Sequence, residues 1–358
     1  MLHRKQYRVA VRVTIMVLAL TLTACGTQEN TGTTESVKST ETVENTETVE
    51  SIETMENTET VKGIETMEST ETIENVEIIE AMVSESAAPQ ETANVTPQMQ
   101  PVEYTDLQQI TLDPNWEYAD HSKINTGAAV LYPAPEESGR KGIVIGVNAG
   151  HGTAGGAKVK TLCHPDGSAK VTGGSTAAGA TEAAAVSGGM TFQDGTPERE
   201  VTLRMAQILR DKLLTSGYDV LMLRDSEDVQ LDNVARTVIC NNVANCHIAL
   251  HWDSGDGKNY DKGCFYISVP EALKTMEPVA SHWQQHDTLG TDLVEGLREQ
   301  GAMIYGKGNM SIDLTQTSYS TIPSVDMELG NAYSDHSDEV LEQLATGLLA
   351  GINTYFEQ

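Results

Sequence analysis

Two histidines and two glutamates stand where side chains do chemistry in layered α/β proteins. His151 and His251 each follow an apolar run typical of a buried strand, and Glu328 closes another such run. Glu198 stands in the first turn of a predicted helix, three residues before Val201. Ligands bind at the carboxyl ends of strands in α/β sheets, and imidazole and carboxylate groups transfer protons and bind metal ions. Each residue alone also has an ordinary explanation, as a histidine with its hydrogen bonds made within the protein or as an acid exposed to solvent.

The elements that must position these side chains alternate between strand and helix. Strand patterns occupy residues 142–149, 218–224, 247–253, 264–269 and 324–328, and helical patterns occupy 198–216, 231–243, 288–300 and 337–356. The first of these helices has Thr196 as its predicted N-cap and Pro197 at its first position. This alternation predicts an α/β fold with a mixed central sheet flanked by helices.

Five short blocks follow one another in this region. They are Asn148-Ala149-Gly150-His151-Gly152, Pro197-Glu198-Arg199-Glu200-Val201-Thr202-Leu203, Arg236-Thr237-Val238-Ile239-Cys240-Asn241, Leu250-His251-Trp252-Asp253 and Pro323-Ser324-Val325-Asp326-Met327-Glu328-Leu329-Gly330. Together and in this order, they resemble the zinc-dependent N-acetylmuramoyl-L-alanine amidases of the large cell-wall hydrolase family. The resemblance covers about residues 142–356.

The resemblance implies a role for each of the four polar residues. His151, Glu198 and His251 are the implied ligands of one zinc ion per chain, and Glu328 is the implied catalytic acid/base. The chemistry agrees, since two histidines and a carboxylate leave the fourth zinc position to water, whose pKa zinc lowers to about 7. Arg236 and Asn241 match the family pattern as well, and we expect both to be structural.

The chain departs from the family pattern at several positions. The family often has Asp at the position of Asn148, Ser at Ala249, Ala-Asn at Trp252-Asp253 and Phe at Asn331, and these changes are expected to alter the support of the zinc ligands. The connection from His151 to Glu198 is also unusually long. Its glycine- and alanine-rich composition leaves two interpretations open, a mobile flap over the zinc site and a passive surface insertion.

The resemblance predicts hydrolysis of the amide between N-acetylmuramic acid and L-alanine in peptidoglycan, in cell-wall remodelling or lysis. Two alternatives remain open at this point. One is an inactive wall-binding lipoprotein with the same fold, although retention of all four polar residues argues against it. The other is a zinc amidase or peptidase that acts on a different peptide.

The first 24 residues have the layout of an export signal. A basic start is followed by a short uncharged apolar run and small residues, and Leu22-Thr23-Ala24-Cys25-Gly26 resembles the bacterial lipoprotein box. In that family the cysteine is lipidated and becomes the new N-terminus, and several acyl chains anchor a protein stably. We therefore expect a protein anchored through Cys25 to the outer face of the cell membrane. An ordinary signal peptide cut near Ala24 is the alternative.

Residues 25–101 are predicted to be a disordered tether. Apolar residues recur every sixth position from Val37 to Ile79, so no lasting helical face forms, and glutamate and threonine fill the intervals. A flexible segment of this length spans on the order of 50 Å, which suits a reach from the membrane into the cell wall. Residues 102–141 are a lead-in without an assigned function, and 142–358 form the expected single catalytic domain.

The net charge excludes one class of partner. Asp and Glu number 52 against 23 Lys and Arg, for a formal charge of −29, and such a surface repels nucleic-acid phosphates. No apolar run in the sequence reaches the roughly 18 residues needed to span a bilayer. The four cysteines of the domain are compatible with two disulfides in any of three pairings, or with free buried thiols: Cys163, Cys240, Cys246 and Cys264.

Overall fold

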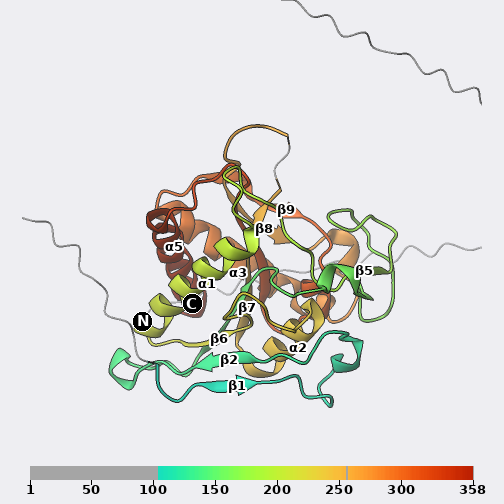
Figure 1. Ribbon diagram of the computed structural model, residues 1–358, viewed down its shortest axis with the longest axis horizontal. Coiled ribbons are helices and arrows are strands. Elements are labelled where there is room, and N and C mark those ends of the chain that lie inside the picture. Colours follow the sequence, from blue (N-terminus) through green and yellow to red (C-terminus); the bar gives the residue numbers. More distant parts are fainter. Residues whose placement is uncertain (1–103, 255–256, 358) are drawn as a thin grey trace, which may run out of the picture. The chain divides into compact units, whose positions relative to one another are not determined.

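The computed structural model describes residues 104–254 and 257–357. The predicted signal peptide, the lipidation site Cys25 and the whole tether at 25–101 lie outside these residues. In the described part, strands form an eight-stranded sheet in the order β1-β2-β6-β3-β7-β10-β8-β9 (Figure 1). The strands are β1 (Gln108–Ile110), β2 (Ala129–Tyr132), β3 (Val144–Ala149), β6 (Asp219–Met222), β7 (Cys246–Asp253), β8 (Cys264–Ser268), β9 (Ile304–Ser311) and β10 (Ser324–Asn331).

The centre of the sheet is parallel, as the alternation of strands and helices predicts. Strands β6, β3, β7 and β10 run in the same direction, whereas β1, β2 and β8 are antiparallel to their inner neighbours. The expected mixed sheet with flanking helices is therefore confirmed. The carboxyl ends of β3, β7 and β10, which precede or carry three of the four candidate residues, meet at one edge.

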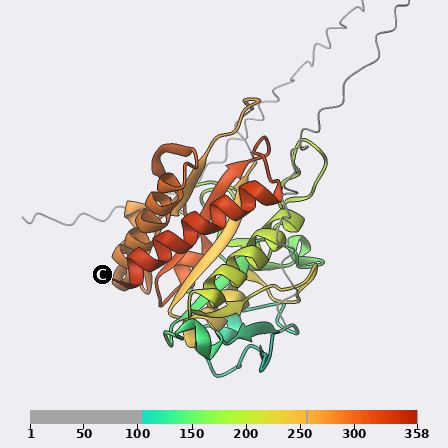
Figure 2. The same ribbon diagram turned by 90° about the vertical axis from the view of Figure 1, so that its left-hand side faces the viewer.

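Three long helices cover one face of the sheet. They are α1 (Glu198–Thr215), α3 (Val279–Glu299) and α5 (Asp338–Phe356), and α5 lies between the other two (Figure 2). Successive strand residues point to opposite faces, so Ile248, Leu250 and Trp252 of β7 join the core beneath these helices. Consequently the intervening residues of β7, which include His251, face the other side.

The opposite face of the sheet carries α2 (Asn233–Val243) and the short α4 (Thr315–Tyr319). Asp232 caps α2 by accepting a hydrogen bond from the amide of Ala235 at 2.8 Å. Ala235 and Ile239 of this helix pack in a second apolar cluster with Leu221. The sheet is thus covered on both faces, as expected for parallel strands.

The lead-in at 102–141 contributes β1 and β2 to the same sheet as the expected domain at 142–358. The segment between His151 and Glu198 also has structure of its own. It forms a small antiparallel sheet from β4 (Lys160–Leu162) and β5 (Glu182–Ala184). Four short 3-10 helices lie in the connections of the described residues: η1 (Ala119–His121), η2 (Glu136–Ser138), η3 (Gly156–Lys158) and η4 (Glu271–Leu273).

Several boundaries differ from the sequence-based expectation. Helix α1 begins at Glu198 with Pro197 as its N-cap, and no side-chain cap bond is made there, so the expected cap at Thr196 is one position too early. Helix α3 begins at Val279, nine residues before the predicted start. The prediction started too late because His282 and other polar residues interrupt the apolar pattern in the first turns of the helix. β9 was not predicted, since it is a largely exposed strand with glycines at 306 and 308.

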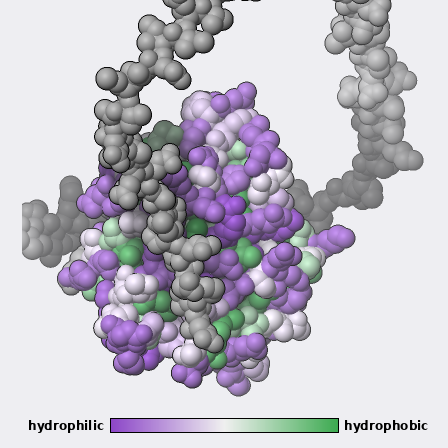
Figure 3. All heavy atoms as spheres, turned by 60° about the vertical axis from the view of Figure 1, so that its left-hand side comes forward, coloured by the Kyte–Doolittle hydropathy of each residue, from purple (hydrophilic) through white to green (hydrophobic). Residues whose placement is uncertain are grey.

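On the face drawn in Figure 3 the surface is mostly hydrophilic, with small scattered apolar patches. Among the described residues, no helix is both long and apolar enough to cross a membrane. The four cysteines of the domain are buried and free of disulfides, which corresponds to the free-thiol alternative.

Candidate metal centre

His151 lies in a sharp turn that leaves β3 two residues before it. Its φ is +64°, a left-handed value that is uncommon for residues other than glycine. The preceding residue must be small, because a Cβ on Gly150 would lie 2.3 Å from Cε1 of His251. Hence the turn brings the His151 and His251 side chains together only with glycine at position 150.

Two fully buried arginines hold this turn. Arg236 on α2 donates to the carbonyl oxygens of Ala149 at 3.1 Å and His151 at 2.7 Å. Arg224, just after β6, donates to the carbonyl oxygens of Ala149 at 3.1 Å and Gly150 at 2.9 Å. Bonds from charged donors are stronger than neutral ones. The two arginines therefore fix the backbone that presents His151.

Glu198 reaches the same place from the first turn of α1. Its side chain is buried, and each carboxylate oxygen accepts a backbone amide: Oε1 from Trp252 at 3.0 Å and Oε2 from Met190 at 2.8 Å. Val201, one turn further along α1, is fully buried in the core. The apolar side of α1 thus anchors the helix with Glu198 at its tip.

His251 and Glu328 face the same side of the sheet. In the parallel register of β7 and β10, these two residues are Cα partners. The neighbouring residues on β10, Met327 and Leu329, belong to the core under the three long helices. Because strand residues alternate, Glu328 and Asp326 point away from that core, to the side occupied by His251.

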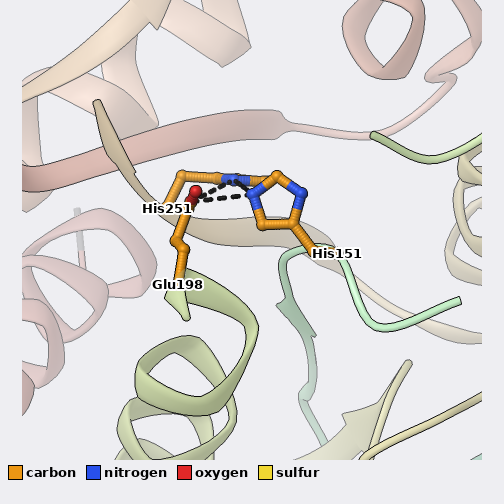
Figure 4. Close-up of side chains that lie close together, drawn as sticks. All are labelled: His151, Glu198 and His251. Atoms are coloured by element: carbon orange, nitrogen blue, oxygen red, sulfur yellow. Dashed lines mark hydrogen bonds and ion pairs between the residues drawn. The ribbon is translucent and has the colours of Figure 1, made fainter. Parts of the chain in front are cut away.

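The donor atoms of His151, Glu198 and His251 converge (Figure 4). Glu198 Oε1 lies 2.8 Å from His151 Nε2 and 3.1 Å from His251 Nδ1, and the two ring nitrogens are 3.0 Å apart. All three ligand atoms lie within 4.8 Å of one another. Ligands about 2.0–2.2 Å from a tetrahedral zinc lie roughly 3.3–3.6 Å from each other. The three residues therefore fit a shared zinc ion with little movement.

The electrostatics of the cluster favour a cation. Burial opposes charge on Glu198, but hydrogen bonds from His151 and His251 hold its pKa well below the usual range. Burial also opposes charge on His251, yet the charges of Asp326 and Glu198 raise its pKa to about 10. Surroundings that stabilise an imidazolium in this way also stabilise a bound divalent ion. The donor set and its charge both suit zinc.

The pKa of Glu328 is shifted in the opposite direction from that of Glu198. Burial, followed by the charge of Asp326, raises its pKa well above the ordinary value of a carboxyl group. Its Oε2 is buried and has no hydrogen-bond partner among the described residues. A buried carboxyl group with a raised pKa is the type of group used for general acid/base catalysis.

The long segment from 152 to 197 forms one wall of a cavity beside the cluster. The cavity, of about 160 Å³, is lined by His151, His251 and Arg236 from the domain and by several residues of this segment. Those residues include Lys160, Lys170, Ser175, Thr176, Ala183, Ala184, Val186 and Ser187. The segment therefore borders the site along much of its length.

Buried polar contacts attach this segment to the domain. Asp313, just after β9, is 1 % exposed and lies 2.9 Å from His164 Nε2 through its Oδ1. Its Oδ2 accepts the backbone amide of Val171 at 2.7 Å, and Lys170 donates to its carbonyl oxygen. The segment has a small sheet and a buried anchor, so it is more than the unstructured loop that its glycine content suggests.

The other predicted residues divide into two groups. Arg236 supports the His151 turn, whereas Asn241 lies elsewhere and bonds to the carbonyl oxygen of Tyr319 at 2.8 Å and the amide of Thr321 at 3.0 Å. Sequence reasoning missed Arg224, whose charge at the end of an apolar strand was the available signal. It also missed Asp326, although this residue lies on the same strand face as Glu328.

Comparisons with known proteins agree with the architecture. A family described as N-acetylmuramoyl-L-alanine amidase matches residues 145–352. The solved amidase Ami1 from Mycobacterium smegmatis is 17% identical, with a TM-score of 0.50, and the match covers 60% of this chain and 97% of that one. Ami1 from Mycobacterium abscessus is 19% identical, with a TM-score of 0.49, over 60% and 99% of the two chains. No curated protein matches the chain.

Proposed function

The chain belongs to the N-acetylmuramoyl-L-alanine amidase family, and from this membership we propose that its reaction depends on zinc held by His151, Glu198 and His251. It is an N-acetylmuramoyl-L-alanine amidase that acts on peptidoglycan. The bond assigned to it is the amide between the lactyl group of N-acetylmuramic acid and L-alanine. The observation that carries the zinc assignment is the convergence of three donor atoms within 4.8 Å.

Each residue of the site has a part in this reaction. His151, Glu198 and His251 would hold the metal ion, which supplies Lewis-acid polarisation of the carbonyl and lowers the pKa of water. Glu328 takes the proton of the attacking water at its carboxylate. As the carbon–nitrogen bond breaks, it returns that proton to the departing amine of L-alanine. Glu328 is in position for this exchange, because it leaves β10 on the side of His251 and its Oε2 has no hydrogen-bond partner among the described residues.

The test is metal removal and restoration in the full chain. Dialysis against a strong chelator should abolish the release of stem peptides from purified peptidoglycan, and stoichiometric zinc should restore it. Mass analysis of the released stems identifies the bond that is cut. Stems with a free L-alanine amine support the proposal, whereas cleavage elsewhere favours a peptidase and persistent inactivity favours a wall-binding protein. Full activity in verified metal-free protein contradicts zinc dependence.

We also propose that the protein is exported and anchored through lipidated Cys25, with the acidic segment as its tether into the cell wall. This rests on the lipoprotein-box resemblance at Leu22-Thr23-Ala24-Cys25. Cys25→Ala, or inhibition of the lipoprotein signal peptidase with globomycin, should lower the fraction of the protein that is bound to the membrane. The untreated wild type should stay membrane-bound. Equal membrane association in treated and untreated cells contradicts the anchor.

A further inference from the structure

The two histidines of the cluster have different partners on their outer nitrogens. His151 uses Nε2 toward the cluster, and its Nδ1 lies 3.0 Å from the carbonyl oxygen of Ser187 and 3.1 Å from the Ser187 hydroxyl. His251 uses Nδ1 toward the cluster, and its Nε2 faces Asp326 Oδ2 at 3.8 Å. One outer partner is therefore a serine and the other is an acidic side chain.

Asp326 makes a single ion pair in the described part of the chain. His251 is its sole ion-pair partner there, and its Oδ1 is buried without a hydrogen-bond partner. The Asp326 side chain is 13% exposed. A carboxylate in such a place is costly unless a nearby positive group or N–H compensates it. The His251 ring is the group in position to do so.

The strand geometry makes this arrangement a fixed one. Asp326 lies two residues before Glu328 on β10, so both side chains leave the strand on the face toward His251. Its Cα partner on β7 is Ala249, two residues before His251. The ladder of backbone bonds between β7 and β10 therefore sets the position of Asp326 relative to the His251 ring.

We propose that Asp326 is a positioning residue that orients His251 as a metal ligand. The charge of a carboxylate 3.8 Å from Nε2 favours the neutral tautomer with its proton on that nitrogen and leaves Nδ1 free to bind zinc. It also increases the basicity of the ligand, because its negative charge favours electron donation through the ring. The inference rests on the proposed zinc site. It assigns Asp326 no contact with the substrate and no place among the ligands, since it faces the outer nitrogen.

The test compares zinc affinity in four full-length proteins. Competition with a chromogenic chelator should show zinc bound about 10–100-fold more weakly in Asp326→Ala than in the wild type. Asp326→Asn keeps the size and shape of the side chain but loses the charge that faces Nε2, so its affinity should fall between the two. Glu339→Gln removes an equal charge from the exposed first turn of α5 and should bind zinc as the wild type does. Nitrogen-15 NMR of His251 reports the tautomer directly.

The outcomes separate this inference from the proposed function. If the wild type binds no zinc, the proposed function fails and the inference fails with it. If the wild type binds zinc and both folded Asp326 variants bind it equally well, only the role of Asp326 is overturned. An increase in KM at unchanged zinc affinity and kcat also overturns it, because that result places Asp326 against the substrate. Asp326→Asn, which preserves size and shape, keeps the test valid if Asp326→Ala unfolds.

Discussion

Glu328 on β10 and His251 on β7 are Cα partners in a parallel ladder. The proposed acid/base and one proposed zinc ligand therefore come from neighbouring strands at the same level of the sheet. Glu198 reaches them from the tip of a helix that packs on the opposite face. This arrangement separates the residues that would hold the metal from the residue that would move the proton, and the two roles can be tested independently.

The first prediction concerns Glu328→Gln. The amide keeps the size of the side chain but cannot take a proton from water, so kcat should fall by about 10²–10⁴-fold. Zinc content should stay at the wild-type level, because Glu328 is outside the converging donor set. Turnover on purified peptidoglycan and metal analysis of the same sample measure both effects. Wild-type kcat in Glu328→Gln would remove Glu328 from the mechanism.

The second prediction compares two adjacent glycines. Gly189 has a φ of +80°, and a Cβ there would lie 2.9 Å from Cδ2 of His151 and 3.0 Å from Oε2 of Glu198. Gly189→Ala should therefore displace both side chains and weaken zinc binding. Gly188 has open space around the corresponding position, so Gly188→Ala is the matched control and should bind zinc normally. Equal zinc affinity in the two variants would show that the contact is unimportant.

The third prediction concerns the buried arginine that holds the His151 turn. Arg236→Met removes the bond to the carbonyl oxygen of His151 and one of the two arginine bonds to that of Ala149, which should lower the free energy of unfolding by about 2–4 kcal/mol and weaken zinc binding. Asn241→Ala, on the same helix, removes bonds remote from the site and should leave zinc affinity unchanged. Urea unfolding and chelator competition provide the two readouts. Zinc affinity that falls equally in both variants would contradict a specific role for Arg236.

The fourth prediction is a loss of stability in acid. Burial, followed by the charge of Arg236, lowers the pKa of His247 to about 3, and neither ring nitrogen has a hydrogen-bond partner among the described residues. An unfolded histidine titrates near 6.5, so the unfolded state binds the proton first as the pH falls. The contribution of neutral His247 to the free energy of unfolding is therefore complete above pH 6.5. It decreases as the pH falls from 6.5 toward 3, by up to about 1.4 kcal/mol per pH unit.

The measurement is urea unfolding of the wild type and His247→Phe at pH 7.5 and pH 5. Phenylalanine fills a similar volume and does not titrate, so the free energy of unfolding should depend less on pH in the variant. Other groups contribute equally to both proteins and cancel in the comparison. An identical pH dependence in the two proteins would show that His247 is not the source.

The fifth prediction concerns the segment that borders the cavity. Deleting residues 158–185 and closing the gap with a short glycine linker removes Lys160, Lys170 and Thr176 from the cavity wall. Ser187 and Met190, which bond to His151 and Glu198, remain, so zinc should stay bound. A functional wall or flap predicts a clear change in rate on peptidoglycan. Unchanged kinetics on intact sacculi and on small muropeptides would leave the passive interpretation.

Much of the fold follows from local patterns in the sequence. The apolar runs before His151 and His251 are strands because buried parallel strands need apolar residues on both faces, and the stripe from Leu341 to Ile352 is buried along α5. The exposed edge strand β9 has no such pattern, and β1 and β2 are short. These elements are determined by pairing with the sheet, which local sequence does not reveal.

The candidate site was predictable for a different reason. His151, Glu198, His251 and Glu328 belong to ordered blocks that resemble one family, and the structure places the first three together. The supporting residues were harder to recognise, because Arg224 and Asp326 act through contacts across strands and Ser187 contacts His151 from the long segment before α1. The anchoring of the long segment at Asp313 depends on residues more than 140 positions apart, a relationship that only the folded chain displays.

The central claim is that one zinc ion is held by His151, Glu198 and His251. Its most direct test is the zinc content of the purified wild type and of His251→Ala, measured by mass spectrometry on folded, buffer-exchanged protein. We predict one zinc per chain in the wild type and substoichiometric zinc in the variant, with loss of peptidoglycan hydrolysis. A full zinc equivalent in His251→Ala, together with unchanged activity, would contradict the assignment.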